Sequence, residues 1–173
     1  MIEMSGGEDR QYRLGYAGDT LNTAWYMRAL LGPDWSVDYF TALGEDKYSA
    51  DIKGFLDTHS IGTSHIRAIP GRRPGLYLIH QQDGDRQFTY WRDTSAAKLL
   101  ADDKTAMATA LDGADMVYFS GITLAILAPR ARGRLLGAIV RARDAGARVV
   151  FDTNIRPALW TSPRVMASVL TAA

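Results

Sequence analysis

The spacing of apolar positions alternates along the chain between a helical period and short continuous apolar runs. Apolar residues three or four apart predict helices, over 20–31, 47–59 and 131–145. Short apolar runs predict strands, over 37–43, 116–120 and 148–152, the last of them buried. Strands that alternate with amphipathic helices are typical of a parallel sheet covered by helices, so the sequence predicts an α/β fold.

Two antiparallel ribbons are expected to interrupt this order. The strand-like runs 76–81 and 87–92 flank Asp83-Gly84, a pair typical of a two-residue hairpin turn. The residues on either side of Gly6-Gly7 predict a second small ribbon beside the first, and together the ribbons would form a lid. The predicted division is lid ribbons at about 1–16 and 74–92, and an α/β part at about 17–73 and 93–173.

The register of the ribbon around Asp83-Gly84 gathers polar side chains on one face. If these two residues form the loop, Tyr77 lies opposite Tyr90, and Arg92 shares their face. The same face carries Ile79 and Phe88, and the other face carries three large apolar side chains, Leu76, Leu78 and Trp91. Because such a ribbon cannot leave both faces in water, we expect a homodimer or larger assembly through the lid.

Charge narrows the classes of partner. The 173 residues carry 20 Lys and Arg against 19 Asp and Glu, and a formal net charge of +1 supplies no field for holding nucleic acid or an anionic membrane. Six arginines between 130 and 148 lie mostly opposite the apolar stripe of the helix over 131–145, which indicates a solvated face. Four residues of that stripe are expected to point inward, Leu135, Leu136, Ile139 and Val140.

Cysteine and histidine content argues against a metal site. The sequence has no Cys and only three His, none at metal-ligand spacing, so disulfides, thiolate chemistry and zinc are not expected. No apolar run reaches the roughly 18 residues of a membrane span, and the first residues are not a signal peptide. We therefore expect a cytoplasmic protein that uses carboxylates, arginines, hydroxyls and the backbone for its chemistry.

The junction before the first helix is a candidate binding site. Gly18-Asp19 lies where free backbone N–H groups and the helix dipole attract anions or hydroxyl-rich ligands, and Asn22 adds an amide on the first turn. The alternative is an ordinary N-cap formed by Asp19.

Two arginines and the end of a strand supply further candidates. Arg92 and Arg156 offer planar forks for a carboxylate or phosphate, which indicates an acidic substrate unless they only form surface ion pairs. Asp152 and Asn154 end a predicted strand, where α/β sheets place their ligand crevice, although Asp152 could equally be structural.

Six segments occur in an order that resembles ribokinase-like (PfkB-type) sugar kinases over nearly the whole chain. They are AGDTLNTA, TALGEDKYS, RPGLYLI, FTYWRDTSAA, YFSGITLAIL and FDTNIRPALW. The fourth and fifth resemble in particular the branch that phosphorylates 2-keto-3-deoxygluconate. The resemblance implies a three-layer α/β fold with a mostly parallel sheet and a small β lid, and transfer of a phosphoryl group from ATP, with Mg, to that sugar acid.

The resemblance also implies roles for individual residues. Gly18 and Asn22 would line the sugar pocket, with Asp19 in the same loop. Residues implied to contact the sugar acid from elsewhere are Tyr77, Tyr90, Arg92, Ile122 and Arg156. Arg156 would lie between the sugar and the transferred phosphate, and Asn154 on the nucleotide side.

The family's catalytic base is missing from the motifs found. The resemblance implies an Asp in a later Gly-Ala-Gly-Asp motif, which does not occur up to Ala173, and Tyr16-Ala17-Gly18-Asp19 belongs instead to the first sugar-binding motif. Met1-Ile2-Glu3-Met4 resembles the continuation of the family's first strand. We therefore expect a kinase truncated in its C-terminal half and at its first strand, inactive as given.

Two alternatives remain open at this point. One is a fructokinase- or ribokinase-type enzyme for a neutral sugar, which would have no need of the arginine pair Arg92 and Arg156. The other is a non-catalytic fragment that only binds a sugar acid or associates through its lid.

Overall fold

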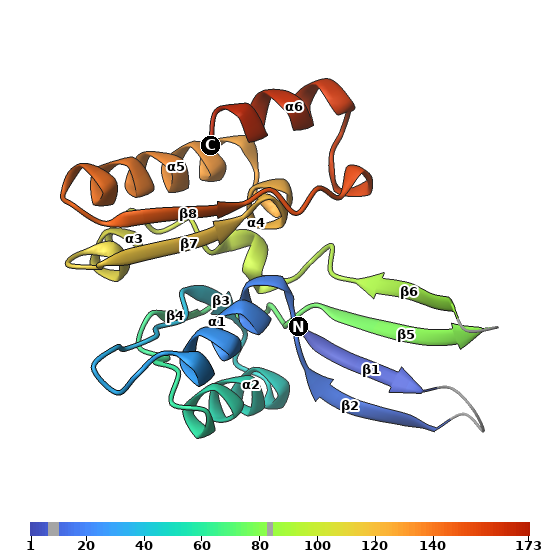
Figure 1. Ribbon diagram of the computed structural model, residues 1–173. Helices are drawn as coiled ribbons and strands as arrows, with labels where there is room; N and C mark the ends of the chain where they lie inside the picture. The colour runs from blue at the N-terminus through green and yellow to red at the C-terminus, as the bar shows by residue number, and fades with distance from the viewer. Residues whose placement is uncertain (7–10, 83–84) are drawn as a thin grey trace. The chain divides into compact units, whose positions relative to one another are not determined.

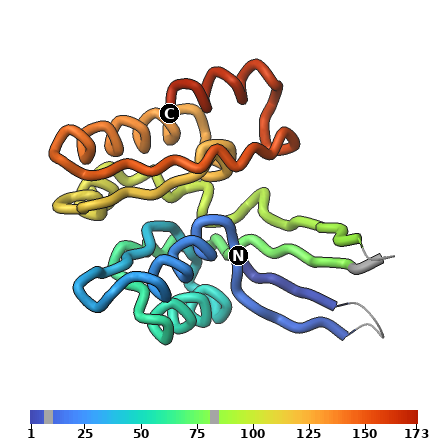
Figure 2. The backbone as a smooth tube through the Cα atoms, in the orientation of Figure 1, coloured from blue at the N-terminus to red at the C-terminus, as the bar shows by residue number. Residues whose placement is uncertain are grey.

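The computed structural model describes residues 1–6, 11–82 and 85–173, which separate into two compact units, Met1–Ala97 and Lys98–Ala173 (Figures 1 and 2). The first unit contains two helices, α1 (Asp19–Leu30) and α2 (Lys47–Thr58). Its strands are β1 (Ile2–Gly6), β2 (Tyr12–Tyr16), β3 (Thr41–Leu43), β4 (Ile66–Ala68), β5 (Leu76–Gln82) and β6 (Asp85–Trp91). A 3₁₀ turn, η1 (Ala96–Leu99), follows them.

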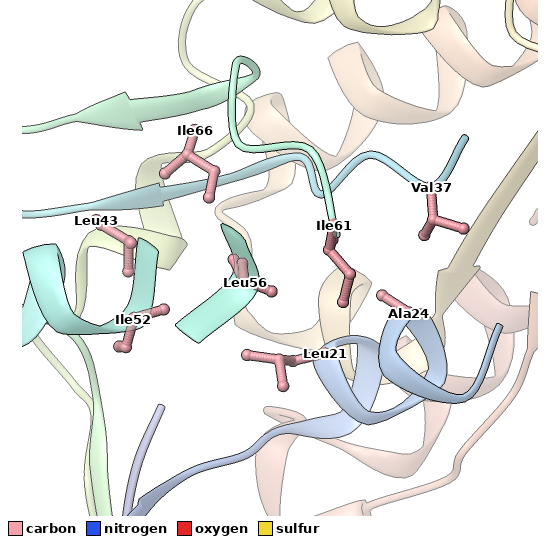
Figure 3. Packing of buried hydrophobic residues seen from close by; sticks show 8 residues of the cluster. All are labelled: Leu21, Ala24, Val37, Leu43, Ile52, Leu56, Ile61 and Ile66. Atoms are coloured by element: carbon pink, nitrogen blue, oxygen red, sulfur yellow. The ribbon is translucent and has the colours of Figure 1, made fainter. Parts of the chain in front are cut away.

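The core of the first unit lies between α1, α2 and the short parallel pair β3–β4. Figure 3 shows its side chains pointing toward one another from these elements: Leu21, Ala24, Val37, Leu43, Ile52, Leu56, Ile61 and Ile66. The helical spacing of Leu21 and Ala24, and of Ile52 and Leu56, places each pair on one helix face, as predicted. The predicted strand over 37–43 is shorter than expected, because only Thr41–Leu43 pairs continuously and Asp38 forms a single bridge with Gly62.

The turn from β3 into α2 is held by side-chain hydrogen bonds. Asp46 is the N-cap of α2, and its carboxylate accepts from the backbone N–H groups of Tyr48 and Ser49. The buried Ser49 hydroxyl accepts from the Gly44 N–H at 2.8 Å and donates to Asp46 at 2.7 Å. The segment Gly44–Ser49 therefore fixes where α2 begins.

Four strands form one mixed sheet in the order β2-β1-β5-β6, with only β1 and β5 parallel (Figure 1). The predicted ribbon register is confirmed, since Tyr77 pairs with Tyr90 and Leu76 with Trp91. The second ribbon is confirmed as β1–β2 and lies beside β5. The predicted turn at Asp83-Gly84 and the second residue of Gly6-Gly7 lie outside the described residues.

The second unit combines helices with one parallel strand pair. Its helices are α3 (Lys104–Leu111), α4 (Gly121–Ile126), α5 (Pro129–Asp144) and α6 (Pro163–Thr171), with a 3₁₀ turn η2 (Pro157–Leu159). Its strands β7 (Met116–Ser120) and β8 (Arg148–Asp152) have the predicted bounds and pair in parallel. Phe119 and Phe151 stack across the pair with ring centroids 4.7 Å apart.

Two burial predictions for this unit are wrong. Strand β8 is half-exposed rather than buried, with Val150 36% exposed, because within the described residues it pairs with β7 alone. Val140 is 43% exposed, because the buried stripe of α5 runs through Leu135, Ala138, Ile139 and Ala142 and leaves Val140 beyond its edge.

The arginines of this unit divide into two groups. Four are exposed as predicted, Arg130, Arg141, Arg143 and Arg148. Arg132 and Arg134 are half-buried, because they donate to backbone carbonyls of Leu124 and Ala101 respectively. Arg132 also lies over the Trp160 ring, so these two hold the fold rather than a solvated face.

The α/β class is confirmed. The described strands divide among a four-stranded mixed sheet and two parallel pairs, β3–β4 and β7–β8. Helix α2 connects β3 with β4, and α4 and α5 connect β7 with β8, which is the alternation that the apolar spacing predicted.

Candidate functional site

One face of the four-stranded sheet collects polar and aromatic side chains. Register places Gly15, Glu3, Tyr77 and Tyr90 in one row across β2, β1, β5 and β6. Residues that share a row lie on the same side of a sheet. We call this side the Tyr77 face and define it by five residues, Glu3, Tyr77, Phe88, Tyr90 and Arg92.

Ring contacts confirm the arrangement on this face. The ring centroids of Tyr77 and Tyr90 are 5.8 Å apart, and those of Phe88 and Tyr90 are stacked at 6.1 Å. The Arg92 guanidinium carbon lies 4.2 Å from the centre of the Tyr90 ring. This cation–π contact holds the Arg92 guanidinium against the Tyr90 ring.

Glu3 belongs to this face and was not among the predicted site residues. The Tyr77 hydroxyl donates a hydrogen bond to Glu3 Oε2. Burial, and after it the hydrogen bond and charge of Glu3, raise the pKa of Tyr77 above its ordinary value. The alternation of Ile2 and Met4 with Glu3 could have placed the carboxylate on the opposite side of the strand from two apolar residues, but not beside Tyr77.

The loop before α1 differs from the sequence interpretation in its N-cap and in the state of one N–H group. Gly18 is the N-cap, without a side-chain cap, and Asp19 is the first helical residue, so the N-cap role for Asp19 is wrong. The Gly18 N–H is not free, because it donates to Asn22 Oδ1 at 3.2 Å. A carboxylate in the first turn suits the helix dipole. Asn22 is exposed, and its amide nitrogen can donate a hydrogen bond.

The remaining predicted residues belong to the second unit. Ile122 is half-buried in the first turn of α4. Asn154 has a positive φ of 29°, a conformation that Asn tolerates better than most residues, and its N–H donates to Asp152 Oδ1 at 2.9 Å. Arg156 is exposed at the start of η2 and donates to the Ile155 carbonyl. Asp152 therefore shapes the loop that carries Asn154 and Arg156.

The described part of the chain has neither a metal-binding cluster nor a membrane-spanning helix. No group of three or more His, Cys, Asp or Glu there could hold a metal ion. No helix there is both long enough and apolar enough to cross a membrane.

Comparison with known proteins assigns the chain to a family. Residues 3–173 match the model of the pfkB family carbohydrate kinases, and the chain belongs to this family. It is 39% identical over 166 residues to 2-dehydro-3-deoxygluconokinase of Escherichia coli strain K12, which covers 94% of this chain and 53% of that protein. Fructokinase of Solanum tuberosum is 31% identical over 121 residues, and the match covers 69% of this chain and 37% of that protein. The chain thus spans about half the length of the curated relatives it matches.

Solved structures agree with the fold. A PfkB family carbohydrate kinase from Listeria grayi superposes with a TM-score of 0.87 at 18% identity, covering 99% of this chain and 54% of that one. For 2-dehydro-3-deoxygluconokinase from Thermotoga maritima the TM-score is 0.79 at 23% identity, with coverage of 93% and 50%. Fructokinase from Xylella fastidiosa with bound ATP has a TM-score of 0.82 at 22% identity, and the match covers 99% of this chain and 55% of that one.

Proposed function

We propose that the chain carries the sugar-binding part of an ATP-dependent kinase for 2-keto-3-deoxygluconate. The observation that supports it most is the placement of Arg92 beside Tyr90 and Tyr77 on one sheet face. A guanidinium next to two phenols suits a ligand with one carboxylate and several hydroxyls. The name and 39% identity of the Escherichia coli relative point to the same substrate.

Each proposed site residue would contact a different part of the sugar acid. Arg92 would bind the carboxylate with its N–H fork, and Tyr77 and Tyr90 would contact hydroxyls. Asn22 would donate from the start of α1, with Gly18 and Asp19 in the same loop. Ile122 would pack on an apolar edge of the sugar. All of these contacts orient the substrate and none of them moves a proton.

On the nucleotide side the chain offers positioning groups only. Bound ATP would supply the phosphoryl group, and Arg156 would balance its negative charge while the loop around Asn154 lies beside it. Arg156 fits this role because it is exposed and forms no bond beyond the Ile155 carbonyl in the described structure. The described residues include no group of three or more His, Cys, Asp or Glu that could hold a metal ion, so no step through Mg is derived.

Equilibrium binding tests the proposal. Isothermal titration of the 173-residue chain should show tighter binding of 2-keto-3-deoxygluconate than of fructose, which lacks the carboxylate. Equal affinities, or preference for fructose, would favour the neutral-sugar kinase, an alternative supported by 31% identity to the Solanum tuberosum fructokinase.

We expect this chain to bind the sugar acid without phosphorylating it. The sequence contains no Gly-Ala-Gly-Asp run, and Asp19, which ends the most similar tetrapeptide, lies in the first turn of α1. A sugar hydroxyl does not release its proton without a base. The measurement couples ADP release to 2-keto-3-deoxygluconate with Mg-ATP at high protein concentration. Sugar-dependent turnover that disappears in Arg156→Ala would contradict the expectation.

We also propose that two copies associate through the opposite side of the sheet. That side, the Trp91 face, carries Met4, Leu14, Leu76, Leu78 and Trp91. Leu14 is 43% and Trp91 57% exposed, and an apolar sheet face of this kind favours association. Sedimentation at micromolar concentration should show a dimer that Trp91→Glu dissociates. Tyr26→Glu, on the exposed side of α1, should leave it intact, and a monomeric wild-type chain would refute the dimer.

A further inference from the structure

Glu3 stands at one end of the Tyr77 face with space around it. It lies on β1 in register with Tyr77 on one side and Gly15 on the other. A Cβ built on Gly15 would meet no atom within 4 Å, so the side of Glu3 away from Tyr77 is open. The carboxylate accepts from the Tyr77 hydroxyl, and it also interacts electrostatically with the Met1 ammonium.

The hydrogen bond between them fixes what Tyr77 can offer to a ligand. A phenol has one proton to donate and lone pairs that accept, whereas an ionised carboxylate only accepts. Because the Tyr77 proton is directed at Glu3, only the lone pairs of the Tyr77 oxygen remain for a ligand. A ligand group at this point must be a donor, such as a sugar hydroxyl, and a carboxylate there would be repelled.

The Tyr77 face carries opposite charges at its two ends. The row begins with Glu3, continues through the rings of Tyr77 and Tyr90, and ends with the Arg92 guanidinium over Tyr90. With strands about 4.8 Å apart, the backbones of β1 and β6 are about 10 Å apart across β5. By register, Arg13 and Arg86 lie on the same side of the sheet. Arg13 is two residues from Gly15 along β2, and Arg86 is four residues from Tyr90 along β6. The row itself thus has a negative and a positive end.

We propose that Glu3 is a positioning residue that sets the direction in which a sugar acid lies on this face. It holds the Tyr77 hydroxyl as an acceptor, so that the hydroxyl-bearing part of the ligand lies at Tyr77 and the carboxylate at Arg92. The inference rests on the proposed function. It assigns Glu3 an effect that passes through Tyr77, in contrast to a direct contact with the ligand.

Tyrosine resonances test the contact without any ligand. In protein labelled at the tyrosine Cζ, Glu3→Gln should move the Tyr77 signal at neutral pH, because the carboxylate acceptor is lost. Tyr16 is a matched internal control, since its hydroxyl donates to another carboxylate, Asp51 Oδ2, at 3.2 Å. The Tyr16 signal should stay in place. An unmoved Tyr77 signal would overturn the proposal.

A double-mutant cycle on the dissociation constant for 2-keto-3-deoxygluconate separates positioning from direct contact. Glu3→Gln and Tyr77→Phe should each weaken binding by about tenfold, the usual effect of one hydrogen bond involving a charged group. The double variant should bind no more weakly than Tyr77→Phe, and Glu3→Asp should restore part of the affinity.

Each other outcome has a distinct meaning. If the losses in the double variant add, Glu3 contacts the ligand itself and the positioning role is wrong. If Glu3→Gln binds like the wild-type chain, the inference fails while the proposed function stands. If the wild-type chain does not bind the sugar acid at all, the proposed function fails and the inference fails with it, whatever the tyrosine spectra show.

Discussion

Arg92→Ala is expected to weaken binding of 2-keto-3-deoxygluconate to this chain by roughly 10²-fold or more. Removing one partner of a desolvated, charge-assisted pair costs about 2 to 5 kcal/mol, and 1.4 kcal/mol is a factor of ten. The Arg92 side chain is half-buried and lies against the Tyr90 ring, so its pairing with a carboxylate is less screened than at an open surface.

Two further variants show whether the guanidinium geometry matters. Arg92→Lys should recover only part of the affinity, because an ammonium lacks the planar fork and stacks less well on Tyr90. Arg86→Ala is the matched control, since Arg86 projects from the same face of β6 but is exposed and lies further along the strand. Titration calorimetry gives the three dissociation constants. Unchanged affinity in Arg92→Ala, or an equal loss in Arg86→Ala, would refute the carboxylate assignment.

The part of the Tyr77 face that lies on β5 and β6 could be predicted because local sequence determines its geometry. Alternating strand residues on both sides of Asp83-Gly84 allow one register, and that register puts Tyr77, Tyr90 and Arg92 on the same side. The observed ring contacts follow from the pairing alone. A hairpin is a short-range structure, so nothing from distant parts of the chain was needed to predict it.

Glu3 could not be assigned in the same way, because its partner is 74 residues away. Its contact with Tyr77 depends on β1 pairing in parallel with β5, and parallel pairing leaves no turn signal in the sequence. The N-terminal ribbon was predicted beside the other one, but without a register between them. A long-range register was therefore the missing piece of information.

The errors in burial and capping have physical causes of a different kind. An apolar run such as Val149–Phe151 has the composition of a strand with both faces covered, but its burial depends on which elements pack on it. At the start of α1, an Asp before an apolar period predicts an N-cap, and the helix begins one residue earlier than that pattern implies. The consequence is chemical, because with Gly18 as the N-cap its N–H donates to the Asn22 side chain.

The sequence motif TALGEDKYS contains a glycine, Gly44, whose structural role could not be predicted from its sequence neighbours. Its Gly44 has no unusual φ, so a turn argument does not explain the residue. The structure explains it by close approach, since a Cβ at Gly44 would lie 2.0 Å from the Arg72 carbonyl oxygen and 2.7 Å from Asp46 Oδ2. The first of these atoms is backbone and cannot rotate away.

Gly44→Ala is accordingly expected to destabilise the chain by about 3 kcal/mol, the upper part of the range for overpacking, with a further loss of about 1 kcal/mol if the Asp46 cap is displaced. Gly54→Ala is the matched control. Gly54 lies exposed in the interior of α2, and a Cβ built on it has no atom within 4 Å. It should stabilise α2 by about 0.5 to 1 kcal/mol through helix propensity.

Urea unfolding followed by circular dichroism measures the stability of both variants. A Gly44→Ala midpoint equal to that of the wild-type chain would show that β3 and the Arg72 segment can separate without cost, and the fixed start of α2 inferred from the Ser49 and Asp46 hydrogen bonds would then be wrong.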